Sequence, residues 1–275
     1  MNLVDLAVHV DHSSKCQVAL DMAVALAQRC EAHLTGVYVD SVPMAPELMA
    51  MSAAPVLMDT IVQEETERAD KAQRRFDDTL ASSGVLNSFR RGTGPRYVAL
   101  STHARYADLM VIAQEDESGS VAGGFADYVV MDCGRPVLMA PFIGAALPVD
   151  GTVVVAWNGT RESARAVNDA LPLLSMAQQV QVVVIEPEDT PLYDAALPGA
   201  DLCEHLARHG LKVEAKVIRG TSVAAGDQLL SHVADVSANL LVMGAYGHSR
   251  LREMVLGGVT RHMLRHMTVP VLMSH

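Results

Sequence analysis

The sequence contains the same pattern twice, and this internal repeat restricts the possible folds more than any other feature. Residues Ala107–Ala113 match Ala238–Gly244, which lie 131 positions later in the chain. Residues Pro136–Met139 recur as Pro270–Met273, 134 positions later. A repeat of this length in a chain of 275 residues predicts two copies of one structural unit.

The boundary between the copies is expected in the segment Pro141–Asp150, where prolines and glycines interrupt any helical or strand period. The openings of the copies also align, because Leu6–Asp11 and Val153–Asn158 are largely apolar runs that end in a short acid or amide. We therefore predict one domain over residues 1–143 and a second over residues 150–275, each of ordinary domain size.

Each copy alternates short apolar runs with segments whose apolar residues follow a helical spacing. In the second copy the expected strands are Thr152–Trp157, Val180–Ile185, Leu211–Arg219, Leu240–Met243 and Val269–Met273, and the expected helices are Glu162–Met176, Asp201–His209, Val223–Val236 and Val259–Met267. Continuously apolar strands separated by helices are typical of parallel sheets covered on both faces. The predicted class is α/β, with two tandem doubly wound, Rossmann-like domains of five parallel strands each.

Composition and charge exclude several classes of protein. Half of the residues are hydrophobic and 19% are charged, which is typical of a globular chain. The apolar runs fall far short of the roughly 20 residues that cross a bilayer, so no membrane span or membrane partner is expected. Because Met1–Val10 lacks the basic start of a secretory signal, we expect a cytoplasmic protein. The net charge of −11 opposes binding to nucleic acid.

One segment, Met243–Thr260, carries glycines where an anion could bind. It follows an apolar strand, leads into a helix and contains Gly244, Gly247, Gly257 and Gly258. Ligands of open parallel sheets lie at the carboxyl ends of the strands, where a helix amino terminus presents free N–H groups to phosphate. The glycines alone support this interpretation no better than one in which they end a strand and turn a loop.

The spacing Gly244-x2-Gly247-x9-Gly257 after an aliphatic strand, together with the ending Pro270–Met273, resembles the universal stress protein family. The resemblance extends over both copies and implies two domains similar to the five-stranded, adenine-nucleotide-binding fold of that family. It implies ATP, alone or with Mg, as the ligand of the second domain.

The resemblance also assigns ligand contacts to the second copy. Asn158 takes the position of an acidic residue that faces adenine, and Val184 would supply backbone to adenine. The residues implied around the ribose and the phosphates are Met243, Gly244, Gly247, Gly257, Gly258, Val259 and Thr260. Arg250 lies in the same loop and is a secondary candidate for a phosphate contact, although a solvated surface arginine is the plainer interpretation.

Two positions depart from the family pattern. Gly258 replaces the serine or threonine that often follows the third glycine, which removes one hydroxyl but keeps the backbone donor. Asn158 keeps an acceptor in place of the acid and adds an amide donor, so its contact with adenine can change.

The first copy lacks the features that suit a phosphate. Its segment Ala113–Ser120 has no glycine at the first motif position and carries Glu115, Asp116 and Glu117 where phosphates would lie. At an effective dielectric near 20, like charges about 4 Å apart repel by about 4 kcal/mol, so these carboxylates oppose a triphosphate unless a metal bridges them. Although Asp11 is retained, we predict a degenerate, structural first domain and a nucleotide-binding second domain.

Other features carry no predicted chemistry. Asp40–Thr60 is a long, Met-rich connection that we interpret as a flexible flap or packing segment. His262 and His266 have the spacing of a zinc-binding pair but lack the adjacent glutamate, so we expect a surface helix and no metal site. The four cysteines lack C-x-x-C spacing and are expected to be buried thiols. No Gly-x-Ser-x-Gly sequence occurs, so no catalytic residue is assigned.

Three hypotheses of function follow from these observations. The first is a cytoplasmic stress-response protein in which ATP in the second domain controls a regulatory or protective activity. The second is an enzyme with slow ATP hydrolysis or adenylyl transfer, and the third is a structural or interaction protein whose pockets bind no nucleotide. The resemblance further implies an internal pseudo-dimer through edge pairing of Val137–Ala140 with Val271–Ser274, and a homodimer of whole chains is an additional option.

Overall fold

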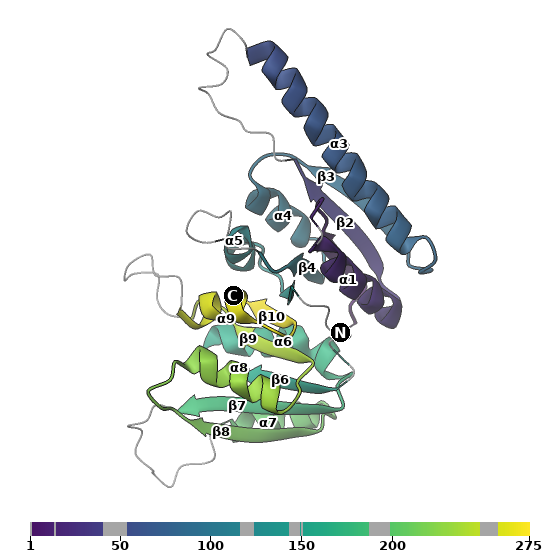
Figure 1. Ribbon diagram of the computed structural model, residues 1–275. Helices are drawn as coiled ribbons and strands as arrows, with labels where there is room; N and C mark the ends of the chain where they lie inside the picture. Colours follow the sequence, from purple (N-terminus) through teal and green to yellow (C-terminus); the bar gives the residue numbers. More distant parts are fainter. Residues whose placement is uncertain are drawn as a thin grey trace.

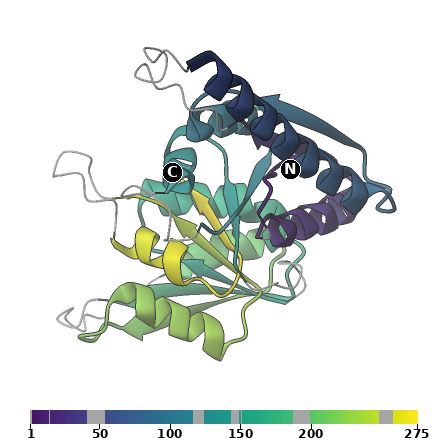
Figure 2. The same cartoon turned by 45° about the horizontal axis from the view of Figure 1, so that its top comes forward.

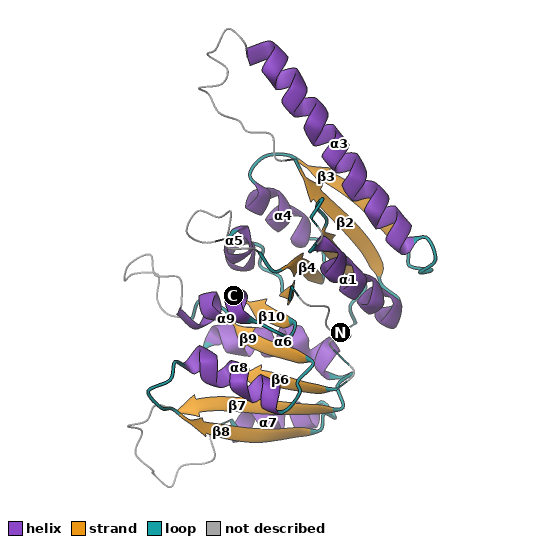
Figure 3. Cartoon of the chain, in the orientation of Figure 1, coloured by secondary structure: helices purple, strands orange, loops and turns teal. Residues whose placement is uncertain are grey.

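The computed structural model describes residues 2–13, 15–40, 54–115, 124–142, 149, 151–186, 199–247 and 258–275. In this part of the chain the strands form one sheet of ten strands in the order β3-β2-β1-β4-β5-β10-β9-β6-β7-β8 (Figure 1). Helices cover the sheet on both faces, with a strand and a helix alternating along most of the chain (Figure 3). The predicted α/β class, with two tandem copies of one unit, is confirmed.

The two copies contain matching elements. The first copy consists of β1 Asp5–His9, α1 Cys16–Cys30, β2 His33–Val39, α3 Ala54–Leu80, β3 Asn87–Gly92, α4 Arg96–Ala104, β4 Leu109–Ala113, α5 Phe125–Asp132 and β5 Val137–Ala140. The second consists of β6 Thr152–Ala156, α6 Arg161–Leu174, β7 Gln179–Glu186, α7 Ala200–Arg208, β8 Val213–Arg219, α8 Ala225–Asp235, β9 Leu240–Gly244, α9 Gly258–His266 and β10 Val271–Ser274. Each boundary in the second copy lies within two residues of the one that periodicity predicts.

The strand order is the same in both copies, and the copies join at one pair of strands. Within each copy neighbouring strands run parallel, and the first strand lies between the second and the fourth. The copies meet where β5 pairs antiparallel with β10, with Leu138 opposite Leu272. This is the pairing of the fifth strands that the resemblance implies, and it covers an edge of each half-sheet.

Two hydrophobic layers run the length of the sheet, one on each face. Residues such as Val8 and Val155 pack under α1, α3, α6 and α7, whereas Ala7 and Val154 pack under α4, α5, α8 and α9. Alternate residues of a strand point to opposite faces, so continuously apolar strands supply both layers. Figure 2 shows α1 and α3 side by side over the first copy.

Helix α3 includes the end of Asp40–Thr60, the segment that we interpret as a flexible flap or packing segment. Residues 54–60 form the first turns of this helix of 27 residues, while residues 41–53 lie outside the described part of the chain. Pro55 is compatible with the helix because it lies in the first turn. The N–H groups of a first turn have no carbonyl partner within the helix, so the missing N–H of proline costs no hydrogen bond there. None of the described helices, α3 included, is long and apolar enough to cross a membrane.

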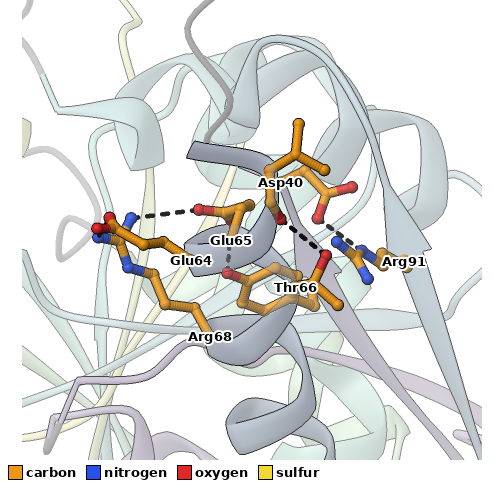
Figure 4. A network of polar contacts seen from close by, with 8 residues as sticks. Asp40, Glu64, Glu65, Thr66, Arg68 and Arg91 are labelled. Atoms are coloured by element: carbon orange, nitrogen blue, oxygen red, sulfur yellow. Dashed lines mark hydrogen bonds and ion pairs between the residues drawn. The ribbon is translucent and has the colours of Figure 1, made fainter. Parts of the chain in front are cut away.

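A polar network fixes α3 to the sheet edge (Figure 4). The buried Glu65 carboxylate accepts the hydroxyl of Tyr38, on β2, at 2.6 Å and pairs with Arg68 at 3.3 Å. Beside it, Arg91 on β3 donates to Asp40 at 2.6 Å. Burial, together with the hydrogen bond to Glu65, raises the pKa of Tyr38, so its hydroxyl stays a donor. The network joins α3 to β2, which lies beside β1 in the sheet.

The four cysteines are free thiols. Cys16 and Cys133 are buried as expected, whereas Cys30 and Cys203 are half-buried.

Candidate functional site

Both copies contain a point where the strand order reverses, which is where open parallel sheets bind ligands. In the first domain it lies between the carboxyl ends of β1 and β4, and in the second between those of β6 and β9. The registers correspond, because Leu6 faces Leu109 as Val153 faces Leu240. The two points can therefore be compared residue by residue.

In the second domain the residues after β6 form the amino-terminal cap of α6. Thr160 is the cap, and its Oγ1 accepts the N–H of Ser163 at 3.3 Å. The N–H and hydroxyl of Thr160 both donate to Asn158 Oδ1, at 3.2 and 2.9 Å. Because a backbone N–H can only donate, the atom facing Thr160 is the oxygen. The exposed Asn158 therefore has its amide Nδ2 left as a donor for a further partner.

Gly244 and Gly247 lie against the start of α6, which gives each a packing role. A Cβ on Gly244 would lie 2.5 Å from the backbone N of Ser163, too close for any side chain. A Cβ on Gly247 would lie 3.2 Å from Glu162 Oε2. The absence of a side chain thus lets the end of β9 approach the helix, whether or not a ligand is bound.

Glu162 is the buried carboxylate of this site. It is 4% exposed and pairs with Arg161 Nε at 2.5 Å. Burial alone would raise the pKa of Glu162, but the hydrogen bonds that it accepts from Arg161, Thr160 and the backbone, together with the charge of Arg161, lower the pKa. This side chain is therefore an ionised partner of Arg161.

The first turn of α9 lies beside the loop that follows β9. Thr260 is buried, and its Oγ1 accepts the N–H of Tyr246 at 3.4 Å. Gly258 and Val259 are exposed, and no described atom lies within 4 Å of the position that a Cβ would take at Gly258. The structure thus brings Gly244, Gly247 and Thr260 to the same edge as Asn158.

The remaining predicted contact residues lie within the strands or outside the described residues. Met243 is a buried residue of β9 and Val184 a half-buried residue of β7, the strand next to β6. Trp157 directly follows β6 and is half-buried. Arg250 and Gly257 lie outside the described residues, as do Asp116 and Glu117 of the first copy.

In the first domain a carboxylate of the chain itself lies at the equivalent helix start. Glu115 Oε2 accepts the N–H of Ala126, in the first turn of α5, at 3.4 Å. A Cβ on Gly124, the residue before α5, would overlap that carboxylate oxygen. Burial raises the pKa of Glu115, and the N–H groups of Ala126 and Phe125 offset part of this effect. A carboxyl group of the protein itself therefore occupies this helix terminus.

Further side chains fill the first-domain crevice. His9 is buried with its ring 5.2 Å from that of Phe125, and Arg96 lies over the same ring at 5.1 Å. Burial lowers the pKa of His9 to about 4, with Asp11 opposing and Arg96 adding to the shift. Burial of Asp11 alone would raise its pKa, but the charge of His9 and the hydrogen bonds from Ser13 lower it.

At the positions of His9 and Arg96 the second domain has alanines. Ala156 corresponds to His9 through the strand register, and Ala225, the first residue of α8, corresponds to Arg96, the first residue of α4. The second domain thus has two methyl groups at the positions where the first domain has an imidazole and a guanidinium.

Two contacts between the domains were not predicted. Tyr246, in the loop after β9, donates its hydroxyl to Asp127 Oδ1 of the first domain at 2.5 Å. Gln114 of the first domain donates Nε2 to the carbonyls of Leu264 and Arg265, at the end of α9, at 2.9 and 3.0 Å. These partners are more than 110 residues apart in sequence, and no local spacing indicates them.

The histidine pair on α9 has a local partner. His262 lies 2.9 Å from Asp227 of α8, and its ring centroid is 4.5 Å from that of His266. Within the described ranges no group of three metal-type side chains gathers around them or elsewhere.

Comparison with known proteins identifies relatives of both copies. The model of the universal stress protein family matches residues 6–141 and 151–275. Universal stress protein Slr1230 of Synechocystis sp. is 24% identical over 170 residues, which cover 60% of this chain and 57% of that relative.

Two solved structures show the same tandem fold. A universal stress protein from Archaeoglobus fulgidus has a TM-score of 0.76 at 14% identity, over 98% of this chain and 97% of its own. A structure from Pseudomonas aeruginosa has a TM-score of 0.61 at 14% identity, over 99% of this chain and 93% of its own. At these identities the likeness concerns the fold.

Proposed function

The chain belongs to the universal stress protein family, and from this premise we propose that its second domain binds ATP while its first domain does not. The proposed site is the crevice at the ends of β6 and β9, and the amino terminus of α9 receives the phosphates. Occupancy of the site would control a regulatory or protective activity of the whole protein in the stress response.

One observation supports this proposal above the others: the two equivalent helix starts differ. At α5 the carboxylate of Glu115 takes the N–H groups that a phosphate would need. At α9 no described atom approaches the Cβ position of Gly258. A helix amino terminus carries about half a positive charge and free N–H groups, which favour an anion.

The residues of the second domain would divide the ligand between them. The first turn of α9 offers backbone N–H groups to phosphate, and the exposed Gly258 stands at the start of that turn. Asn158 would lie beside the base, and Ala156 takes the position that the larger His9 has in the first domain. Mg, if it accompanies ATP, would be held by the phosphates, since no three metal-type side chains gather among the described residues.

No observation favours an enzyme over a binding protein. Among the described residues, the carboxylate beside Gly247 is that of Glu162, which is buried, paired with Arg161 and lowered in pKa, so it is a weak proton acceptor. The packing roles of Gly244 and Gly247 would suit a protein that binds no nucleotide, and that alternative is decided by titration.

The sharpest test adds a carboxylate to the open helix start. We expect calorimetric titration, with Trp157 fluorescence as a second signal, to show one ATP per chain. Gly258→Glu should weaken ATP binding at least tenfold by repulsion, whereas the matched neutral variant Gly258→Gln should stay within about threefold.

The result that contradicts the proposal is the absence of ATP binding by the unaltered protein at millimolar concentration, or equal binding by the two Gly258 variants. Phosphate release measured over hours would separate a binding protein from a slow ATPase.

A further inference from the structure

The loop that follows β9 contains a residue in an unusual backbone conformation. Tyr246 has φ of 59°, in the left-handed region that residues other than glycine rarely adopt. It lies between Ala245 and Gly247, so its conformation sets the direction in which the glycine loop leaves the strand. A conformation of this kind persists only where surrounding contacts hold it.

Contacts hold Tyr246 at both its backbone and its side chain. Its N–H donates to Thr260 Oγ1, in the first turn of α9, at 3.4 Å. Its hydroxyl donates to Asp127 Oδ1 at 2.5 Å, which is the short length typical of a hydrogen bond to a carboxylate. Burial and the neighbouring Asp127 raise the pKa of Tyr246, so the phenol keeps its proton for this bond.

Asp127 is a fixed point in the other domain. It lies in the first turn of α5 and is 4% exposed. The side chain that holds Tyr246 is therefore a buried part of the first domain.

A second bridge holds α9 at its opposite end. Gln114, 3% exposed, donates to the carbonyls of Leu264 and Arg265, and its Oε1 accepts the N–H of Phe142. Helix α9 is thus fixed at its carboxyl end by the first domain, while its amino end receives the Tyr246 N–H.

We propose that Asp127 is a positioning residue for the nucleotide site of the second domain, because it holds the described residues Ala245–Gly247 through the hydroxyl of Tyr246. The domain that binds no nucleotide then sets the affinity of the domain that does. This inference rests on the proposed function, because it concerns the affinity of the same site.

The test is a double-mutant cycle read by calorimetric titration with ATP. Tyr246→Phe and Asp127→Ala should each weaken binding about tenfold, the usual effect of losing a hydrogen bond to a charged group. The double variant should be no weaker than the single ones, because both remove the same bond. Asp127→Asn keeps an acceptor for the phenol and should stay within about threefold of the unaltered protein.

Asp132→Asn is the matched control. Asp132 lies on the same helix, is exposed and pairs with Arg105 of its own domain, so we expect no change in ATP affinity. Thermal unfolding of each variant identifies a loss of fold. If Asp127→Ala does not fold, the comparison of Tyr246→Phe with Asp127→Asn still decides the question.

The inference is overturned if Tyr246→Phe binds ATP as tightly as the unaltered protein, or if the two single effects multiply in the double variant. In either case the contact is merely structural while the proposed function stands. If the unaltered protein binds no ATP, the proposed function fails and the inference fails with it.

Discussion

The two domains have the same strand order and place the same helix start at the same sheet edge, yet they treat it differently. In the first domain the chain supplies the anion, because Glu115 lies on the N–H groups of α5. In the second domain the start of α9 begins at an exposed glycine. The comparison shows that a fold can keep an anion site as a structural element by filling it with its own carboxylate.

The polar side chains at the two points where the strand order reverses also differ between the domains. His9 and Arg96 surround the Phe125 ring in the first domain, whereas Ala156 and Ala225 stand at these positions in the second. This difference is a second reason for proposing the ligand site in the second domain.

The largest expected effect concerns the glycine that ends β9. Gly244→Val should lower the free energy of unfolding by about 3 kcal/mol or more, because its Cβ would overlap the backbone of α6. Denaturant unfolding measures this loss. Gly258→Ala, where no described atom is near, is the control and should change stability by less than about 1 kcal/mol. A stable Gly244→Val protein would show that this position accepts a side chain, as the equivalent position in the first domain does with Ala113.

The next effect distinguishes the domains by pH. The pKa of His9 falls from 6.5 in the unfolded chain to about 4 in the folded protein. The unfolded state then binds more protons between these values, so stability falls as pH drops through this window. The loss should reach the order of 3 kcal/mol near pH 4, since each unit is worth about 1.4 kcal/mol.

Unfolding measured from pH 7 to pH 4 tests this dependence. His9→Gln should flatten it, whereas His12→Gln, an exposed neighbour, should leave it unchanged. An equal slope in the unaltered protein and His9→Gln would show that His9 is not held neutral by burial.

The smallest effect concerns the residue after the first strand of each domain. Asp11 retains a second carboxylate oxygen after accepting the N–H of Ser13, whereas Asn158 retains only a donor. Adenine presents an amino group, so Asn158→Asp should strengthen ATP binding a few-fold and weaken ITP, which presents a carbonyl there. Titration of both nucleotides measures the preference, with Asn168→Asp on the exposed face of α6 as the control. Weaker ATP binding by Asn158→Asp would mean that the amide donates to the ligand.

Much of the fold follows from the sequence, because its apolar periodicity is local. The repeat fixes the tandem arrangement, and the runs around Val153 and Leu240 give strands of a parallel sheet. Helix α3 was missed because its outward face is charged and it begins in a segment with prolines and methionines, which resembles a loop.

The site was only partly predictable. The glycine spacing follows from the sequence, but the packing of Gly244 on Ser163 depends on the approach of two elements distant in sequence. The acidic segment indicates a lost anion site, but not that Glu115 would lie on α5. The bond from Tyr246 to Asp127 depends on how two domains pack, and no spacing within either copy carries that information.

The most direct test of the account is a crystal structure of the protein soaked with ATP. The account predicts phosphate density at the amino terminus of α9, with Glu115 still on α5 and no nucleotide in the first domain. Nucleotide density at α5 in place of the Glu115 carboxylate, or in neither domain, would contradict it.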